Sequence, residues 1–173
     1  MRELVLGGVK SGKSTLALEL ATASAGEVVF IATATAGDEE MRRRIERHRR
    51  ERPANMEVVE EPLHLAGALE REARSGRCLL VDCLTLWLSN LLVRTDDALL
   101  AAETGALVDT LPSLPGHVVL VANETGLGIV PDSALARRFN DEAGVLHQRL
   151  AARSDRVILV AAGLPLVLKG PPL

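Results

Sequence analysis

Residues 3–24 read "ELVLGGVKSGKSTLALELATAS", a stretch that joins a short apolar run to a helical pattern through a glycine-rich loop. Gly7, Gly12, Lys13 and Ser14 fill the pattern G-x-x-x-x-G-K-[ST], which indicates phosphate binding when a strand precedes it and a helix follows. The glycines let the backbone wrap closely around phosphate oxygens, while N–H groups and the helix N-terminus face the negative charge. The stretch therefore predicts a nucleotide phosphate loop (P-loop) rather than an ordinary glycine turn.

Cationic and hydroxyl side chains of this loop predict how a triphosphate is held. Lys13 reaches the β- and γ-phosphates, and the hydroxyl group of Ser14 ligates Mg²⁺. Lys10, inside the loop, either adds a second cation near the phosphates or is a solvated surface lysine. The sequence leaves both interpretations of Lys10 open.

Apolar runs of strand length recur along the rest of the chain, separated by helical patterns. They are β-branched and continuous, as expected for strands that are covered on both faces. The alternation predicts an α/β fold with a mostly parallel central sheet and helices on both faces. The last run follows a turn at Gly163, so we expect a C-terminal antiparallel edge hairpin. The expected strands are 3–7, 27–32, 78–83, 117–123, 156–162 and 164–169, and the expected helices are about 13–24, 38–52, 64–75, 84–93, 97–111 and 132–153.

Length and composition predict a single domain, residues 1–173. With 173 residues, of which 47% are hydrophobic, the chain can bury one core of ordinary size. The formal net charge of −3 predicts no general affinity for nucleic acid or for an anionic membrane surface. No apolar run approaches the roughly 18 residues of a membrane span, and Cys78 and Cys83 form neither a disulfide framework nor a zinc-ligand pattern. These features together predict a cytoplasmic protein.

An acidic residue follows the apolar run in "CLLVDC", residues 78–83, where Asp82 ends a predicted buried strand. A carboxylate in this place holds Mg²⁺ beside a P-loop, usually through water. The end of a buried strand also often carries an ordinary acidic residue. Because an intact P-loop needs a carboxylate partner, the metal role of Asp82 is favoured.

The segment "EMRRRIERHRRERP", residues 40–53, surrounds one histidine, His48, with seven arginines between residues 42 and 52. In a helix, Arg44 and Arg52 lie one turn to either side of His48 on the same face. One interpretation is a solvated helix laced with salt bridges. The other is a nucleophile, because a neutral imidazole attacks phosphorus without an added base, and guanidinium groups neutralise a triphosphate and its departing pyrophosphate. The residues alone leave both interpretations open.

The loop "ANETGLGIVPDS", residues 122–133, lies between a predicted strand and a predicted helix. The carboxyl ends of parallel strands form the ligand crevice of an α/β sheet, so this loop and the P-loop are expected at one edge. Asn123 and Glu124 either bind substrate or order the metal shell, or the loop is a tight turn that its glycines permit. His64, His117 and His147 are expected to be capping, surface or packing residues.

Taken together, these motifs resemble the bifunctional adenosylcobinamide kinase / adenosylcobinamide-phosphate guanylyltransferase family of cobalamin biosynthesis. The most specific likeness is carried by R-I-x-x-H-x-x-x-R-P, D-C-L-T-x-W-x-x-N and N-E-x-G-x-G-I-V-P. The resemblance implies a RecA-like P-loop fold and two reactions. In the first, ATP or GTP phosphorylates the aminopropanol hydroxyl of adenosylcobinamide. In the second, GMP passes from GTP through a covalent GMP-histidine intermediate to that phosphate, giving adenosyl-GDP-cobinamide.

The same resemblance implies roles for particular residues. It makes His48 the guanylylated residue and makes Ser14 and Asp82 the Mg²⁺ site, partly through water. It also implies a corrinoid substrate and a homo-oligomer, with a trimer favoured. Three positions depart from the family's usual residues: Lys10 is commonly arginine, Ala122 is commonly threonine, and His147 is commonly asparagine. The implied nucleotide contacts are Gly7, Gly8, Val9, Lys10, Ser11, Gly12, Lys13, Ser14, Thr33, Ala34, Thr35, Arg49, Arg50, Glu51, Arg52, Glu60 and Asp82.

Two other functions are compatible with the residues. A kinase with a single activity would use the arginine segment as a triphosphate clamp and would form no covalent intermediate. A regulatory switch would bind nucleotide to control the docking of a partner and would turn over no small molecule.

Overall fold

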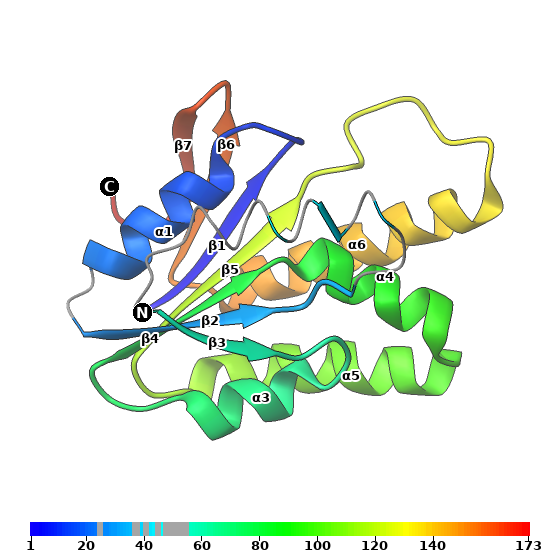
Figure 1. Ribbon diagram of the computed structural model, residues 1–173. Helices are drawn as coiled ribbons and strands as arrows, with labels where there is room; N and C mark the ends of the chain where they lie inside the picture. Colours follow the sequence, from blue (N-terminus) through cyan, green and yellow to red (C-terminus); the bar gives the residue numbers. More distant parts are fainter. Residues whose placement is uncertain (24–25, 36–38, 40–41, 44–45, 47–55) are drawn as a thin grey trace.

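A seven-stranded sheet in the order β3-β2-β4-β5-β1-β6-β7 forms the centre of the protein (Figure 1). The computed structural model describes residues 1–23, 26–35, 39, 42–43, 46 and 56–173. Strands β1 to β6 run parallel to their neighbours, and β7 pairs antiparallel with β6. The predicted parallel sheet and its C-terminal edge hairpin are therefore confirmed.

Strands and helices largely alternate along the chain. The strands are β1 (Arg2–Gly7), β2 (Glu27–Ala32), β3 (Glu57–Glu60), β4 (Arg77–Asp82), β5 (His117–Asn123), β6 (Arg156–Ala161) and β7 (Leu164–Lys169). The helices are α1 (Lys13–Ala23), α3 (Leu65–Glu72), α4 (Leu84–Arg94), α5 (Asp97–Thr110) and α6 (Ala134–Arg153), with a 3-10 turn, η1 (Leu111–Ser113).

Successive residues of the central strands point to opposite faces of the sheet, and each face is covered by helix. In β1, Leu4 and Leu6 join the core beneath α3 to α6, whereas Val5 joins the core beneath α1. All three are at most 8% exposed. The continuous apolar runs of the sequence are explained by this burial on both sides, because side chains on either face pack against helices.

The sequence missed one strand. β3 reads "EVVE" and pairs with β2 at the edge of the sheet, where Glu57 and Glu60 remain exposed. Two valines between glutamates give neither a continuous apolar run nor a long alternation, so the pattern carried no strand signal. The helix expected over 38–52 falls mainly outside the described residues.

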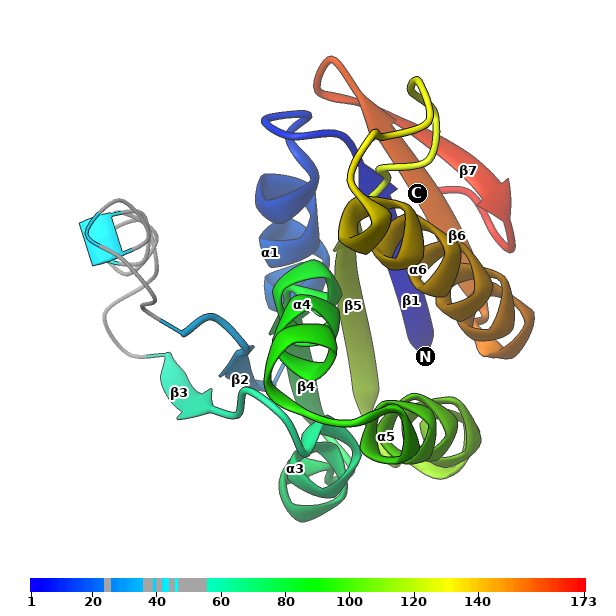
Figure 2. The same ribbon diagram turned by 90° about the vertical axis from the view of Figure 1, so that its right-hand side faces the viewer.

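Three connections that follow the carboxyl ends of strands lie at the same end of the sheet. Figure 2 shows the P-loop after β1, the long loop after β5 and the β6–β7 turn together there. Among the described residues, no helix combines the length and apolar character needed to cross a membrane.

Candidate active site at the carboxyl edge of the sheet

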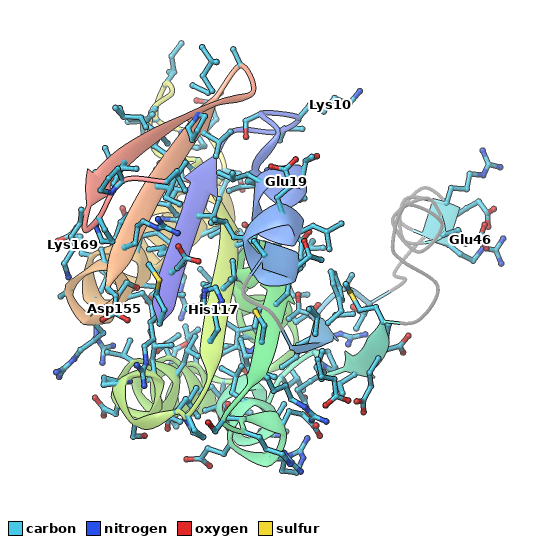
Figure 3. All side chains as sticks on the ribbon, turned by 90° about the vertical axis from the view of Figure 1, so that its left-hand side faces the viewer. Lys10, Glu19, Glu46, His117, Asp155 and Lys169 are labelled. Atoms are coloured by element: carbon cyan, nitrogen blue, oxygen red, sulfur yellow. The ribbon has the colours of Figure 1, made fainter. Side chains whose placement is uncertain are left out.

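The P-loop connects the buried end of β1 to the first turn of α1. Ser11 N donates to Gly8 O at 3.2 Å, and Lys13 Nζ donates to the same carbonyl at 3.0 Å. Gly12 has φ = 98°, a conformation that favours glycine, and Lys10 at the loop tip has φ = 56°. Lys13 is buried, whereas Lys10 projects away from the protein (Figure 3). The structure thus folds one loop lysine over the phosphate loop and leaves the other in solvent.

Gly7 is required by a close approach of the chain to itself. A Cβ at this position would lie 2.4 Å from Ser11 Oγ and 2.6 Å from Val160 O. The β6–β7 turn also braces the loop, since Gly163 N donates to Ser11 O at 2.8 Å. Among the described residues, Ser11 Oγ is the buried side-chain oxygen or nitrogen that lacks a hydrogen-bond partner. A buried hydroxyl inside a P-loop is a group that a phosphate oxygen can satisfy.

Asp82 and Ser14 offer oxygen ligands at this edge. Asp82 is the last residue of β4, and Ser14 is the second residue of α1; both side chains are half-buried. One carboxylate and one hydroxyl are the hard donors that Mg²⁺ prefers, and Mg²⁺ in such sites takes its remaining ligands from phosphates and water. No group of three or more His, Cys, Asp or Glu among the described residues could hold a metal ion by itself. The donor set therefore fits a nucleotide-bound Mg²⁺.

Cys83, which follows Asp82, is not suited to act as a nucleophile. Burial, together with the neighbouring Asp82 carboxylate, raises the pKa of the Cys83 thiol to about 11. The thiol therefore stays protonated at neutral pH. Thr33 fixes this point of the chain, because its Oγ1 donates to Cys83 O at 2.7 Å and accepts from Cys83 N at 3.1 Å. Thr33 itself is fully buried.

Asn90 on α4 connects the segments that precede and follow residues 36–55. Its Nδ2 donates to Thr33 O at 2.8 Å and to Pro62 O at 3.2 Å, and its Oδ1 accepts from Thr35 Oγ1 at 3.1 Å. The nearby Trp87 Nε1 donates to Leu63 O at 2.8 Å. One helix therefore binds both flanks of the segment that carries His48 in the sequence.

The loop after β5 begins beside the P-loop. Glu124 N donates to Gly7 O at 3.1 Å, and Asn123 N donates to the hydroxyl oxygen of Thr85 at 2.7 Å. Glu124 Oε1 accepts from Gly126 N at 2.7 Å, and Oε2 lies 3.8 Å from Nδ1 of His147 on α6. The predicted placement of this loop at the P-loop edge is confirmed.

The other predicted site residues lie farther from the P-loop or outside the described part of the chain. Glu60 ends β3, which β2, β4 and β5 separate from β1 in the sheet, so Glu60 is not brought beside the P-loop. Ala34 and Thr35 continue from the end of β2 and are half-buried. The predicted residues that lie outside the described part of the chain are His48, Arg49, Arg50, Glu51 and Arg52.

The remaining histidines have structural surroundings. His64 precedes α3, and its Nδ1 lies 2.7 Å from Glu103 Oε1, a hydrogen bond that raises the pKa of His64. His117 contacts Glu3 at the opposite end of the sheet. Burial lowers the pKa of His147 despite the opposing effect of Glu124. This agrees with the expectation of packing and surface roles.

Thr85 and Asn90 are the residues whose contacts the sequence did not reveal. Both belong to the motif D-C-L-T-x-W-x-x-N and are polar residues in a mostly apolar helix. This contrast between polar residues and their apolar neighbours was the signal in the sequence that could have identified them. Their partners, however, lie in other segments of the chain, which no pattern within the motif identifies.

Comparisons with known proteins find relatives along the whole chain. A family model described as "Cobinamide kinase / cobinamide phosphate guanyltransferase" matches residues 3–168. The chain is 58% identical over 173 residues to a bifunctional adenosylcobalamin biosynthesis protein of Pseudomonas aeruginosa, covering 100% of both chains. It is 37% identical over 182 residues to a protein of that description from Escherichia coli, covering 98% of this chain and 100% of the relative.

Solved structures of more distant proteins share the fold. A Pyrococcus horikoshii protein matches with a TM-score of 0.58 at 10% identity, over 99% of this chain and 87% of its own. A prototypical ATPase from the type III secretion system of pathogenic bacteria matches with a TM-score of 0.56 at 14% identity, over 96% of this chain and 57% of its own. At such identities the likeness shows the architecture alone.

Proposed function

The chain belongs to the cobinamide kinase / cobinamide phosphate guanyltransferase family, and from this premise we propose that its one P-loop serves two successive transfers. In the first, ATP or GTP gives its γ-phosphoryl group to the aminopropanol hydroxyl of adenosylcobinamide. In the second, His48 accepts GMP from GTP and passes it to the new phosphate, which yields adenosyl-GDP-cobinamide. Residues 1–173 would act as one nucleotide-binding domain.

The observation that carries this proposal is the phosphate cradle. Gly7 allows the loop to close on Ser11, Lys13 lies folded over the loop, and Asp82 ends the strand two places along the sheet. Backbone N–H groups and a lysine can bind the β- and γ-phosphates in either reaction, because both reactions begin with a nucleoside triphosphate. A bound Mg²⁺, held by Ser14 and Asp82, would neutralise phosphate charge.

The two transfers differ in which phosphorus is attacked. Phosphoryl transfer takes place at the γ-phosphorus, and guanylyl transfer takes place at the α-phosphorus with pyrophosphate leaving. A neutral imidazole is the nucleophile that the second reaction needs, and the arginines around His48 in the sequence would stabilise the departing pyrophosphate. We assign Thr33, Ala34, Thr35, Glu60 and Arg49 to Arg52 to nucleotide contacts by family resemblance.

We place the corrinoid beside the loop after β5. Three large apolar side chains of this loop, Leu127, Ile129 and Val130, are 84%, 97% and 73% exposed. The loop starts next to Gly7, so a large and partly apolar acceptor bound to it would lie near the phosphates. A homo-oligomer, a trimer by family resemblance, and a cytoplasmic location remain predictions from the sequence.

Incubation with α-labelled GTP and Mg²⁺, followed by peptide mapping, tests this proposal. We expect an acid-labile, base-stable phosphoramidate on the peptide that contains His48, and no label on the His48→Ala variant. His64→Ala is the matched control, because that histidine is exposed and contacts Glu103 rather than the P-loop. Equal labelling of the His48→Ala variant and the unmodified chain would refute the assignment. Phosphorylation of adenosylcobinamide without any labelled intermediate would instead support a kinase alone.

A further inference from the structure

The three nucleophiles of the proposed reactions differ in whether they carry a proton that must be removed. A neutral imidazole attacks with a free lone pair. A phosphate monoester is largely ionised at neutral pH, since its second pKa is about 6. The aminopropanol hydroxyl, by contrast, is a weak nucleophile until a general base takes its proton. Only the kinase step therefore requires a proton acceptor.

The carboxyl edge of the sheet offers few carboxylates for that task among the described residues. Asp82 is committed to the proposed metal site. Glu61 Oε1 already accepts from Leu63 N and His64 N, at 3.1 Å and 2.8 Å, and Glu60 lies on the far strand β3. Glu124 is the carboxylate that follows β5, the strand between the P-loop strand and the Asp82 strand.

The position of Glu124 is fixed by the sheet and by its own loop. Asn123 lies in register with Gly7, and the next residue, Glu124, donates its N–H to Gly7 O at 3.1 Å. The Glu124 side chain is 24% exposed, and the Gly126 N–H holds one of its oxygens at 2.7 Å. The second oxygen, Oε2, is left with His147 Nδ1 at 3.8 Å, which is beyond hydrogen-bond distance.

The neighbouring histidine leaves this oxygen able to accept a proton. Burial lowers the pKa of His147, with Glu124 opposing the shift, so the imidazole is mainly neutral at pH 7. A neutral ring 3.8 Å away does not neutralise the carboxylate as an arginine or lysine would. Among the described residues, no hydrogen bond therefore occupies Oε2 of Glu124, a residue whose backbone N–H is bonded to the phosphate loop.

We propose that Glu124 is the general base of the kinase reaction and takes no part in guanylyl transfer. This inference rests on the proposed function. In the step, the hydroxyl oxygen forms a bond to the γ-phosphorus, the bond from that phosphorus to the β-phosphate bridging oxygen breaks, and the hydroxyl proton passes to Glu124 Oε2. The leaving nucleoside diphosphate takes the electron pair of the broken bond. His147 packs beside the carboxylate from α6, with its Nδ1 3.8 Å from Oε2.

Measurement of both transfers on Glu124→Gln tests this inference, because the amide keeps the shape of the side chain but cannot accept the proton. We expect kcat for phosphorylation of adenosylcobinamide to fall by about 100-fold or more, with little change in KM for the nucleotide. Self-labelling with α-labelled GTP should stay close to that of the unmodified chain, which also shows that the variant is folded. Asp141→Asn, which removes an exposed carboxylate from α6, is the matched control for phosphorylation.

Two results would overturn the inference. If Glu124→Gln phosphorylates at the normal rate, Glu124 is not the base. If phosphorylation and self-labelling fall by the same factor, the residue has a structural role only, and Glu124→Asp, which shortens the side chain but keeps the charge, should then restore neither. Failure of the unmodified chain to label would contradict the proposed function itself, which distinguishes the two failures.

Discussion

The two ends of the central sheet use polar residues in opposite ways. At the carboxyl edge, Ser11 Oγ is buried without a partner among the described residues, and Lys13 lies against a carbonyl of its own loop. At the amino edge, Glu3 is fully buried and accepts from His117 Nε2 at 2.7 Å and from Arg156 Nε at 2.5 Å. Figure 3 shows Lys10 at the top of the molecule and His117 well below it.

The difference separates polar groups that stabilise the fold from polar groups that can bind a ligand. Arg156 also donates to Pro172 O at 2.8 Å, so the amino-edge cluster fastens the C-terminal residues as well. Burial acts to raise the pKa of Glu3, but hydrogen bonds from His117 and Arg156 outweigh it and hold the pKa below its ordinary value. At the amino edge the buried charged groups are paired within the protein. At the carboxyl edge, polar groups can form hydrogen bonds with a ligand.

The largest effect is expected from adding a methyl group inside the phosphate cradle. Gly7→Ala places a methyl group 2.6 Å from Val160 O, so the loop must shift. We expect loss of both transfers by on the order of 100-fold, because a displacement near 1 Å misplaces the phosphates. Gly144→Ala is the matched control, since a Cβ there meets no atom within 4 Å. Nucleotide binding by Gly7→Ala at normal affinity, measured by calorimetry, would show that the loop is not the phosphate site.

Substitutions at the amino edge are expected to lower stability rather than activity. Arg156→Met leaves the buried Glu3 carboxylate with one fewer partner, and we expect the free energy of unfolding to fall by about 3–5 kcal/mol. Both transfers, per folded molecule, should be unchanged. Denaturant unfolding and the two activity assays check this together. The double variant Glu3→Gln with Arg156→Met should recover part of the lost stability. A drop in activity of Arg156→Met without loss of stability would contradict a purely structural role of the amino edge.

Asn90 is expected to combine a smaller stability effect with a functional one. Asn90→Ala deprives the carbonyls of Thr33 and Pro62 of a donor, so stability should fall by about 1–3 kcal/mol. Self-labelling with GTP should fall more than phosphorylation, because the side chain binds both flanks of the segment that contains His48. Ser89→Ala is the control, since Ser89 lies on the same helix but lines a cavity between α4 and α6 and, among the described residues, bonds to neither flank. Equal loss of both transfers would argue against this positioning role.

The smallest expected effect is a loss of folding stability at low pH. Because folding lowers the pKa of Glu3, the folded chain binds that proton less tightly than the unfolded chain. The stabilisation is therefore present above the ordinary glutamate pKa and is lost as the pH falls through it to the folded value. Thermal unfolding between about pH 6 and pH 3 should show this loss. The Glu3→Gln variant should show a shallower dependence, and an identical pH profile would contradict the assignment.

The sequence predicted the carboxyl edge better than the amino edge. A P-loop is a local pattern, since Gly7 to Ser14 are contiguous, and the strands around it are long and apolar. Glu3, His117 and Arg156 are distant in sequence and meet only through the register of β1, β5 and β6. β3 was missed because its two valines depend on β2 for pairing. The contacts of Asn90 were missed because its partners belong to other segments of the chain.

The central claim is that one phosphate cradle serves both transfers, and Lys13→Ala tests it most directly. The lysine lies over the loop with Nζ 3.0 Å from Gly8 O, where it can reach the triphosphate of either reaction. Phosphorylation of adenosylcobinamide and self-labelling with GTP should be measured on the same folded preparation. We predict that both are lost together. Retention of either transfer at the rate of the unmodified chain would contradict the claim.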